Sequence, residues 1–199
     1  MTLAAVAVAA TMNAQMYVGG NIGFNTSSNK TNPAAEATNT QFTINPEFGY
    51  QLDDKLGVGI QLGFTTRNNK TENTTVDPKT TVEAKSTTFS IKPYVRYQAL
   101  TFGKANIFVD GGLNFATTSQ EDMKNEMDFG LFVTPGISFN VSEQWSIVAK
   151  LNDVFTFGYH KDAIADVAGA PDAPSRINAG LSTGGFNLGS LTFGVYYNF

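Results

Sequence analysis

Apolar residues recur at every second position through most of this chain, and this alternation limits the folds that it can adopt. Between Leu56 and Phe64, Leu, Val, Ile and Phe occupy one face and Gly or Gln the other. A period of two is the pattern of a β-strand with two unlike faces. Eight segments follow it: 17–24, 42–52, 56–64, 89–97, 105–115, 129–141, 145–151 and 191–199. Most are close to the ~9–11 residues that a tilted strand needs to cross the hydrocarbon core of a bilayer.

The composition excludes several other classes of protein. Charged residues make up 15% of the chain, well below the ~25% of an ordinary soluble domain. No run of ~18 apolar residues is present to form a membrane-spanning helix, and the absence of cysteine excludes a disulfide scaffold. The net charge of −4 argues against a nucleic-acid partner, because such a partner needs a basic surface. A chain rich in Gly, Phe and Tyr suits a β-barrel with one face in lipid.

Four of the segments also resemble one another, which indicates four β-hairpin repeats. They are Ile44–Tyr50, Ile91–Tyr97, Val133–Phe139 and Leu191–Tyr197. Each carries an aromatic residue at its seventh position: Tyr50, Tyr97, Phe139 and Tyr197. In a barrel these side chains lie at one height, so we predict that they form an interfacial aromatic girdle. Three repeats have proline at the third position, which removes a ladder donor and predicts a shared bulge or bend.

The connections between segments alternate in length. Short connections are expected at 53–54, 100–103 and 142–143, and long polar loops at 25–39, 67–85, 117–127 and 158–187. Short turns at one end and long loops at the other are typical of outer-membrane barrels, whereas a lipocalin-like soluble barrel would keep its apolar face inward. The sequence therefore predicts an all-β fold, an eight-stranded antiparallel up-and-down transmembrane β-barrel, with outer-membrane lipid as its partner.

The inward face of this barrel carries five charged residues. They are Glu47, Lys92, Arg96, Asp110 and Lys150. Counted from the short turn, Lys92 and Asp110 are expected to face each other across their hairpin. Eight strands leave an interior that side chains fill, and isolated ions there are costly, so these charges must pair. We favour a structural network that plugs the barrel, and the alternative is a gated pore whose ion pairs exchange partners to admit water or small ions.

Two stretches depart from the regular pattern. By alternation Asp153 would face lipid, so we expect either a bulge at Asn152–Val154 or an exit from the bilayer there. Residues 176–189 are interpreted as the far end of a long strand pair above the membrane, and not as a ninth strand.

The first residues have the character of a targeting segment. An apolar run from Thr2 to Ala10 precedes small and polar residues, as at the end of a secretory signal peptide. The usual basic region is missing, since the first lysine is Lys30. We therefore interpret residues 1–14 as a signal-peptide remnant with cleavage after Ala14, followed by a barrel domain over residues 16–199. A short buried N-terminal helix is the alternative.

The C-terminal segment Leu191–Phe199 resembles the assembly signal of bacterial outer-membrane barrels, with Phe193, Tyr197 and Phe199 at its alternating positions. Residues 16–199 are similar to small barrels of the outer-membrane protein A/X type, and in particular to stand-alone outer membrane protein beta-barrel domain proteins of Bacteroidetes-like bacteria. This resemblance implies the outer membrane of a Gram-negative cell and insertion by the barrel-assembly machinery through Tyr197 and Phe199. Such proteins are envelope structural proteins, adhesins or narrow channels, so an extracellular ligand or host surface is a further expected partner.

A catalytic role depends on a single residue, His160, because barrel enzymes of the outer membrane use a catalytic histidine. His160 stands beside Lys161 and Asp162 in a segment expected to be a loop. A histidine there is more often solvated than part of a Ser-His-Asp site, so we predict no enzyme. With no cysteine, one histidine and no phosphate-binding glycine motif, no metal or cofactor is expected. The predicted function is a structural or surface-interaction role in the cell envelope, with adhesion included, and the alternative is a gated channel or porin for small solutes.

Overall fold

The computed structural model describes residues 16–32, 35–73, 80–121, 123–151, 153–164, 172–181 and 192–199. The expected signal-peptide remnant, residues 1–14, lies outside this part of the chain. The described residues contain no helix that is long and apolar enough to cross a membrane.

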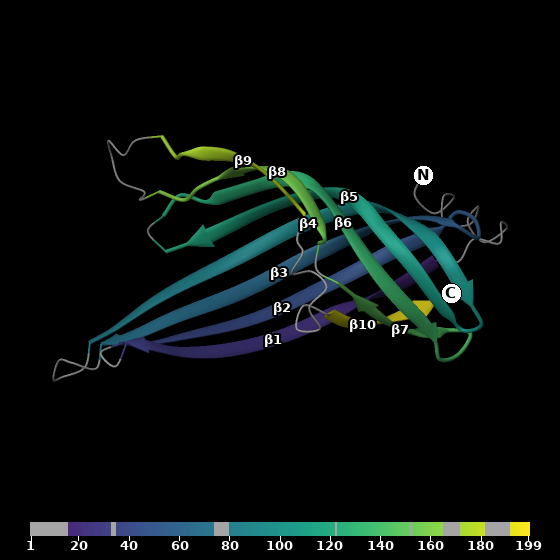
Figure 1. The fold of residues 1–199 in the computed structure, drawn as a ribbon, viewed down its shortest axis with the longest axis horizontal. Coiled ribbons are helices and arrows are strands. Elements are labelled where there is room, and N and C mark those ends of the chain that lie inside the picture. Colours follow the sequence, from purple (N-terminus) through teal and green to yellow (C-terminus); the bar gives the residue numbers. More distant parts are fainter. Residues whose placement is uncertain are drawn as a thin grey trace, which may run out of the picture.

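Antiparallel strands close into a barrel (Figure 1). They are β1 (Met16–Asn32), β2 (Ala35–Gln51), β3 (Leu56–Asn73), β4 (Thr80–Phe102), β5 (Ala105–Gln120), β6 (Glu126–Asn140), β7 (Trp145–Lys150), β8 (Phe155–Lys161), β9 (Ser175–Leu181) and β10 (Thr192–Asn198). Strands β1 to β6 pair in sequence order, β6 continues to β7, β7 to β10, and β10 back to β1. This ring of eight strands confirms the predicted fold class.

Strands β8 and β9 extend the last hairpin of the barrel. β6 pairs with β7 from Gly136 to Asn140 and with β8 from Met127 to Val133, so β7 and β8 lie along the same edge of β6. Among the described residues, β9 pairs only with β8. Residues 176–181 thus lie in a strand pair, as predicted, but they stand beside Phe155 to His160, whose outward rings belong to the lipid-facing wall, so the predicted place above the membrane is wrong for them. The rest of that predicted segment lies outside the described residues.

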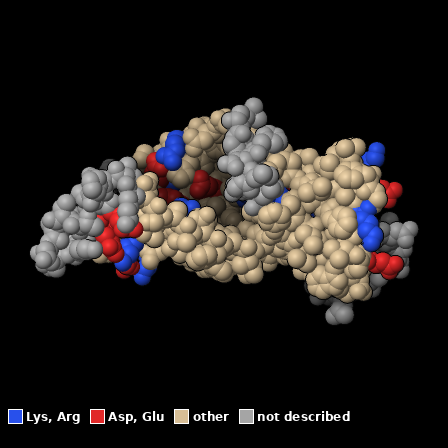
Figure 2. All heavy atoms as spheres, turned by 60° about the horizontal axis from the view of Figure 1, so that its bottom comes forward, with Lys and Arg blue, Asp and Glu red and all other residues tan. Residues whose placement is uncertain are grey.

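The barrel places its apolar side chains outward. Large hydrophobic residues of every strand from β1 to β6 are exposed, whereas the most buried side chains line the interior and include Phe108, Asp110 and Val148, each 2% exposed or less. In Figure 2 uncharged side chains cover the middle of the barrel, while charged ones gather at its two ends and within a hollow. A continuous outward apolar surface of this kind is stable only when lipid covers it.

The hairpins on one side run much further than the alternation predicted. The expected loops 25–39, 67–85 and 117–127 are wrong in large part, because β1 with β2, β3 with β4, and β5 with β6 keep their pairing far into these segments. The last rung of the β3–β4 ladder is Asn73 with Thr80. Thr, Asn, Ser and Lys stand on both faces of these extensions, so the hydropathy does not alternate there. The strands still pair, because the ladder is formed by backbone hydrogen bonds and does not depend on side-chain hydropathy.

The opposite ends of the strands are joined by short turns, as predicted. In the turn after β2, the backbone N–H groups of Lys55 and Leu56 donate to the Asp53 carboxylate at 2.8 Å, and the Lys55 bond lowers the pKa of Asp53 most. The turn between β4 and β5 is the pair Gly103–Lys104. Gly103 has a φ of 61°, which favours glycine in a two-residue hairpin turn.

The three strand prolines differ from the predicted shared bulge. At Pro46 the register toward β3 is the same on both sides of the proline, from Ile44–Phe64 to Glu47–Gln61. Pro93 likewise leaves the register toward β5 unchanged. The missing N–H therefore removes a bond without inserting a residue at these two positions. Only opposite Pro135 does the neighbouring strand bulge.

Candidate functional site

Four charged side chains meet inside the barrel, in the half nearer the short turns. We call them the ion cluster: Glu47, Arg96, Asp110 and Lys150. They come from β2, β4, β5 and β7, and the alternation of each strand directs them inward. Arg96 donates to both Asp110 oxygens at 2.7 and 2.8 Å and to Glu47 at 3.0 Å. Lys150 contacts Glu47 at 2.7 Å and Asp110 at 3.0 Å. Two cations and two anions therefore alternate, and each ion contacts both of its counterions.

Aromatic side chains enclose the ion cluster. The Arg96 guanidinium lies 3.9 Å from the ring centre of Phe108. Tyr94 and Tyr196 donate their hydroxyls to Glu47 Oε1 at 2.5 and 2.8 Å. The Tyr94 ring passes directly over Gly59, where a Cβ would collide with its hydroxyl. Alternation predicts the inward direction of these tyrosines, but it did not predict that their hydroxyls bind Glu47.

The predicted pairing of Lys92 with Asp110 is wrong. Asp110 stands opposite Arg96, because β4 runs to Phe102 and the turn falls at Gly103–Lys104 instead of 100–103. A bulge between Gln98 and Leu100 adds a further shift of register. Lys92 also points into the barrel, but it lies further from the short turns than the ion cluster does, so it joins a different ion pair.

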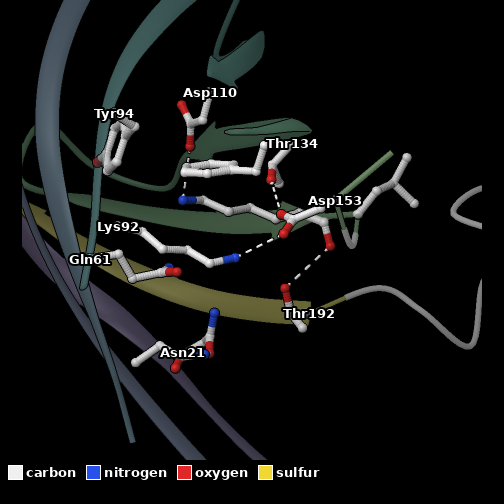
Figure 3. Close-up of a pocket in the computed structure, with 12 residues that line it drawn as sticks. Asn21, Gln61, Lys92, Tyr94, Asp110, Thr134, Asp153 and Thr192 are labelled. Atoms are coloured by element: carbon white, nitrogen blue, oxygen red, sulfur yellow. Dashed lines mark hydrogen bonds and ion pairs between the residues drawn. The ribbon is translucent and has the colours of Figure 1, made fainter. Parts of the chain in front are cut away.

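Lys92 pairs with Asp153 at 2.9 Å, and Asp153 also accepts a bond from Thr134 at 2.5 Å (Figure 3). Asp153 belongs to the irregular segment between β7 and β8. The backbone N–H groups of Leu151 and Val154 still bond to β6, so the segment is a bulge within the barrel wall. The bulge, one of the two expected outcomes, turns this carboxylate away from lipid.

The Lys92–Asp153 pair lines a chamber of about 180 Å³ inside the barrel, on the side of the ion cluster that faces away from the short turns. Asn21 and Gln61 line it (Figure 3), together with Asn45 from the strand between them. Asn45 donates to Asn21 at 2.8 Å. Asp110 and Lys150 form its floor. A second cavity of about 1160 Å³ lies toward the short turns, with Arg96 and Phe108 in its lining. The ion cluster and its aromatic residues therefore form the partition between two spaces.

His160 is held by two carboxylates. Its Nδ1 lies 2.6 Å from Asp128 and its Nε2 lies 2.8 Å from Asp162, which also accepts a bond from Arg176 at 2.5 Å. The expectation of a solvated loop histidine is wrong, because β8 includes His160 and pairs it with Asp128 of β6. Since both ring nitrogens contact carboxylates, neither faces a nucleophile that it could deprotonate.

The predicted girdle residues and Phe199 lie at the end of the barrel that has the short turns, whereas Phe193 lies further from that end, opposite Ala149. Tyr97 and Phe139 point outward and are about half exposed. Tyr197 packs edge-on against Trp145 at 5.1 Å and against Phe199 at 5.0 Å. Tyr50 stands opposite Met16 and Val58. Phe193 and Phe199 are 64% and 69% exposed, and the Phe199 N–H donates to Met16 where β10 meets β1.

Known proteins share this architecture. The model of the family described as outer membrane protein beta-barrel domain matches residues 1–199, and no curated protein matches the chain in sequence. The crystal structure of the outer membrane protein OprG from Pseudomonas aeruginosa has a TM-score of 0.53 at 12% identity, covering 94% of this chain and 95% of OprG. The outer membrane protein W of E. coli has a TM-score of 0.39 at 15% identity, covering 94% and 97%. The likeness to OprG shows the fold alone.

Proposed function

Because this chain belongs to the family of outer membrane protein beta-barrel domains and lies in the outer membrane of a Gram-negative bacterium, we propose that it is a closed barrel with a structural and surface-contact role. The observation that carries this proposal is the partition between the two cavities. The ion cluster and the rings of Tyr17, Tyr94, Phe108 and Tyr196 fill the section between them.

The charges of the partition support a closed state. Removing one ion from its partners in a dry interior costs several kcal/mol. Each ion of the cluster contacts two counterions, and Glu47 accepts tyrosine hydroxyls in addition. Opening a path through the barrel requires several of these bonds to break together, so the closed arrangement is favoured.

Conductance across a planar bilayer tests the closed barrel. The unmodified protein should show no stable open state. A double variant with Arg96→Ala and Asp110→Ala removes one cation and one anion from the partition and should conduct. The matched control, Lys92→Ala with Asp153→Ala, removes one cation and one anion outside the partition and should remain silent. A stable open channel in the unmodified protein would overturn the proposal.

A gated channel is the second candidate, and one observation favours it. Arg96 and Lys150 each contact both Glu47 and Asp110, so a cation can shift toward one anion without losing its last partner. Such a channel would show brief conductance steps whose frequency changes in Lys150→Met. Silence of both proteins over a wide voltage range would end this candidate.

The strand extensions support the surface-contact part of the proposal. The β3–β4 ladder continues for several rungs past the apolar surface, from Asn68–Lys85 to Asn73–Thr80. We propose an extracellular ligand or host surface as the partner of these extensions. Joining Asn68 to Lys85 by a two-residue turn would remove the tip of one hairpin. Cells carrying the shortened barrel should adhere less to a host-cell layer than cells with equal amounts of the full barrel, and equal adhesion would exclude this hairpin as the contact.

A further inference from the structure

Two neighbouring rows of outward side chains run around the barrel near the end that carries the long hairpins. The row nearer the short turns, here the upper aromatic ring, contains Phe24, Phe42, Phe64, Phe89, Phe115, Phe129 and Tyr159. Directly beyond it on β1 to β5, every outward position is threonine, and we call these residues the threonine row: Thr26, Thr40, Thr66, Thr87 and Thr117. Rising strands read Phe-x-Thr and descending strands Thr-x-Phe, as expected when antiparallel strands pass through the same two levels.

The pairing register confirms that the threonine row lies at one level. Thr26 stands opposite Thr40 and Thr66 opposite Thr87, each pair one outward rung beyond a pair of phenylalanines. Between hairpins the register steps by two, so that Phe42 faces Thr66 and Phe89 faces Thr117. Strands that tilt by ~35–45° produce such a step when residues share one height.

The pairing continues around the barrel with different chemistry, but between β6 and β8 Phe129 faces Tyr159 without the step of two, so Lys161 lies one outward rung beyond the threonine row. Thr117 pairs with Met127, Met127 with Lys161, and Lys161 with Ser175. Lys161 is exposed and forms no ion pair with any other described residue. The threonine row therefore presents hydroxyl groups, with the Lys161 ammonium one rung further out, whereas the outer face of the β3–β4 hairpin carries the ion pairs of Lys70 with Glu72 and Lys85 with Glu83.

We propose that the threonine row and Lys161 form a docking surface for the phosphate-bearing head groups of outer-leaflet lipids. The surface continues directly from the lipid-covered band, and aromatic rings mark the level at which hydrocarbon gives way to head groups. A threonine hydroxyl can donate to phosphate or glycosyl oxygens and also accept from glycosyl hydroxyls, and the Lys161 ammonium complements a phosphate charge. The row thereby sets the depth of the barrel in the membrane, whether or not the barrel conducts.

The chain offers a matched pair of variants for the test. The outward variant carries Val at Thr26, Thr40, Thr66 and Thr87. The inward variant carries Val at Thr43, Thr65, Thr88 and Thr118, whose hydroxyls bond to one another in two pairs at 3.0 and 2.7 Å inside the barrel. Both variants remove four hydroxyls and keep β-branched side chains that suit a strand. Folding is verified by the shift on a gel between boiled and unboiled samples, and Thr66→Val with Thr87→Val is the smaller substitute.

Trp145 reports the depth of the barrel because it is the single tryptophan and lies near the opposite end. Its distance from the bilayer centre is measured by quenching with lipids labelled at different depths, in vesicles of phosphatidylethanolamine and phosphatidylglycerol. The outward variant extends the apolar band by one rung, so Trp145 should move about 2–5 Å away from the bilayer centre. The inward variant should leave Trp145 at its original depth. An unchanged depth in the outward variant, or an equal shift in both variants, would overturn the proposal.

Discussion

Arg96 and Asp110 stand directly opposite each other on β4 and β5, and their side chains form a two-bond ion pair inside the barrel. The Arg96 side chain is 6% exposed and that of Asp110 is 2% exposed. The relationship links the register of one hairpin to the closure of the barrel, because a shift of either strand would separate the pair and leave both charges buried.

Breaking this ion pair from one side should destabilise the barrel strongly. Arg96→Met leaves Asp110 with Lys150 as its one remaining cation, and removal of a partner from a buried pair costs about 3–5 kcal/mol. Urea unfolding in vesicles, followed by Trp145 fluorescence, measures this change in the free energy of unfolding. Lys92→Met is the control, since its pair with Asp153 is only partly buried, with the Lys92 side chain 23% exposed, and it should cost less than Arg96→Met.

The double variant Arg96→Met with Asp110→Leu completes the measurement. Replacing both ions with apolar residues should recover much of the loss, because no unpaired charge of this pair remains. A double variant that is as unstable as the sum of the single variants would show that the two residues act independently, contrary to their observed contact.

Gly59 should tolerate no side chain while the Tyr94 ring lies over it. A Cβ at Gly59 would collide with the Tyr94 hydroxyl, so Gly59→Ala should displace that ring from Glu47 and cost about 1–3 kcal/mol. Gly111→Ala is the control, because its Cβ would meet only Phe132 O at 3.9 Å. Adding Tyr94→Ala to Gly59→Ala removes both colliding atoms of Tyr94, the hydroxyl and the ring carbon that bears it, and should reduce the additional loss. The same urea unfolding measures all three, and equal losses in Gly59→Ala and Gly111→Ala would contradict this account.

His160 should titrate above the ordinary histidine range. It follows Tyr159 of the upper aromatic ring and thus lies beyond the lipid-spanning part of β8. The bond to Asp128 raises its pKa above 6.5, more than partial burial lowers it. A raised pKa in the folded state means that the contact stabilises fully below pH 6.5 and loses its effect as the pH rises through the folded value.

The single histidine makes this titration simple to measure, because one imidazole signal appears in the NMR spectrum. Asp128→Asn should lower the pKa of His160, whereas Asp53→Asn, at the opposite end of the barrel, should leave it unchanged. An unaltered titration in Asp128→Asn would exclude the proposed cause.

Phe199 should contribute to assembly more than to stability. Its side chain is 69% exposed on the lipid face, and we propose that it and Tyr197 engage the barrel-assembly machinery before insertion. Phe199→Ala should reduce the amount of folded barrel in the outer membrane of cells several-fold, while purified protein refolds into vesicles as before. Phe193→Ala removes an aromatic ring of similar exposure from β10, and it tests how far the effect depends on the terminal position.

The sequence predicted the strand segments whose residues alternate in polarity. The lipid-facing side of β3 follows from Leu56 to Phe64, because outward and inward residues differ in polarity at each step. The continuation of β3 to Asn73 could not be predicted in this way, since both of its faces are polar. The pairing of Lys92 depended on the turn position, which a bulge near Gln98 and the Gly103 turn displaced.

Contacts between distant strands were harder to anticipate. The bonds of His160 to Asp128 require the register of β8 against β6, and that register depends on the bulge between Lys150 and Phe155. The two tyrosines bound to Glu47 come from β4 and β10, 47 and 149 residues further along the chain. Alternation assigned these side chains to the interior but carried no information on which of them meet.

The bulge between β7 and β8 also shows a rule of parity. Four residues, Leu151 to Val154, stand opposite only two residues of β6, because Lys150 pairs with Gly136 and Phe155 with Val133. The surplus is an even number, so the strand resumes in its original phase, with Phe157 and Tyr159 in lipid and His160 inside. An odd surplus would exchange the two faces, so that Phe157 and Tyr159 would point inward and His160 outward. Insertion or deletion of one residue here should therefore be far more damaging than a change of two.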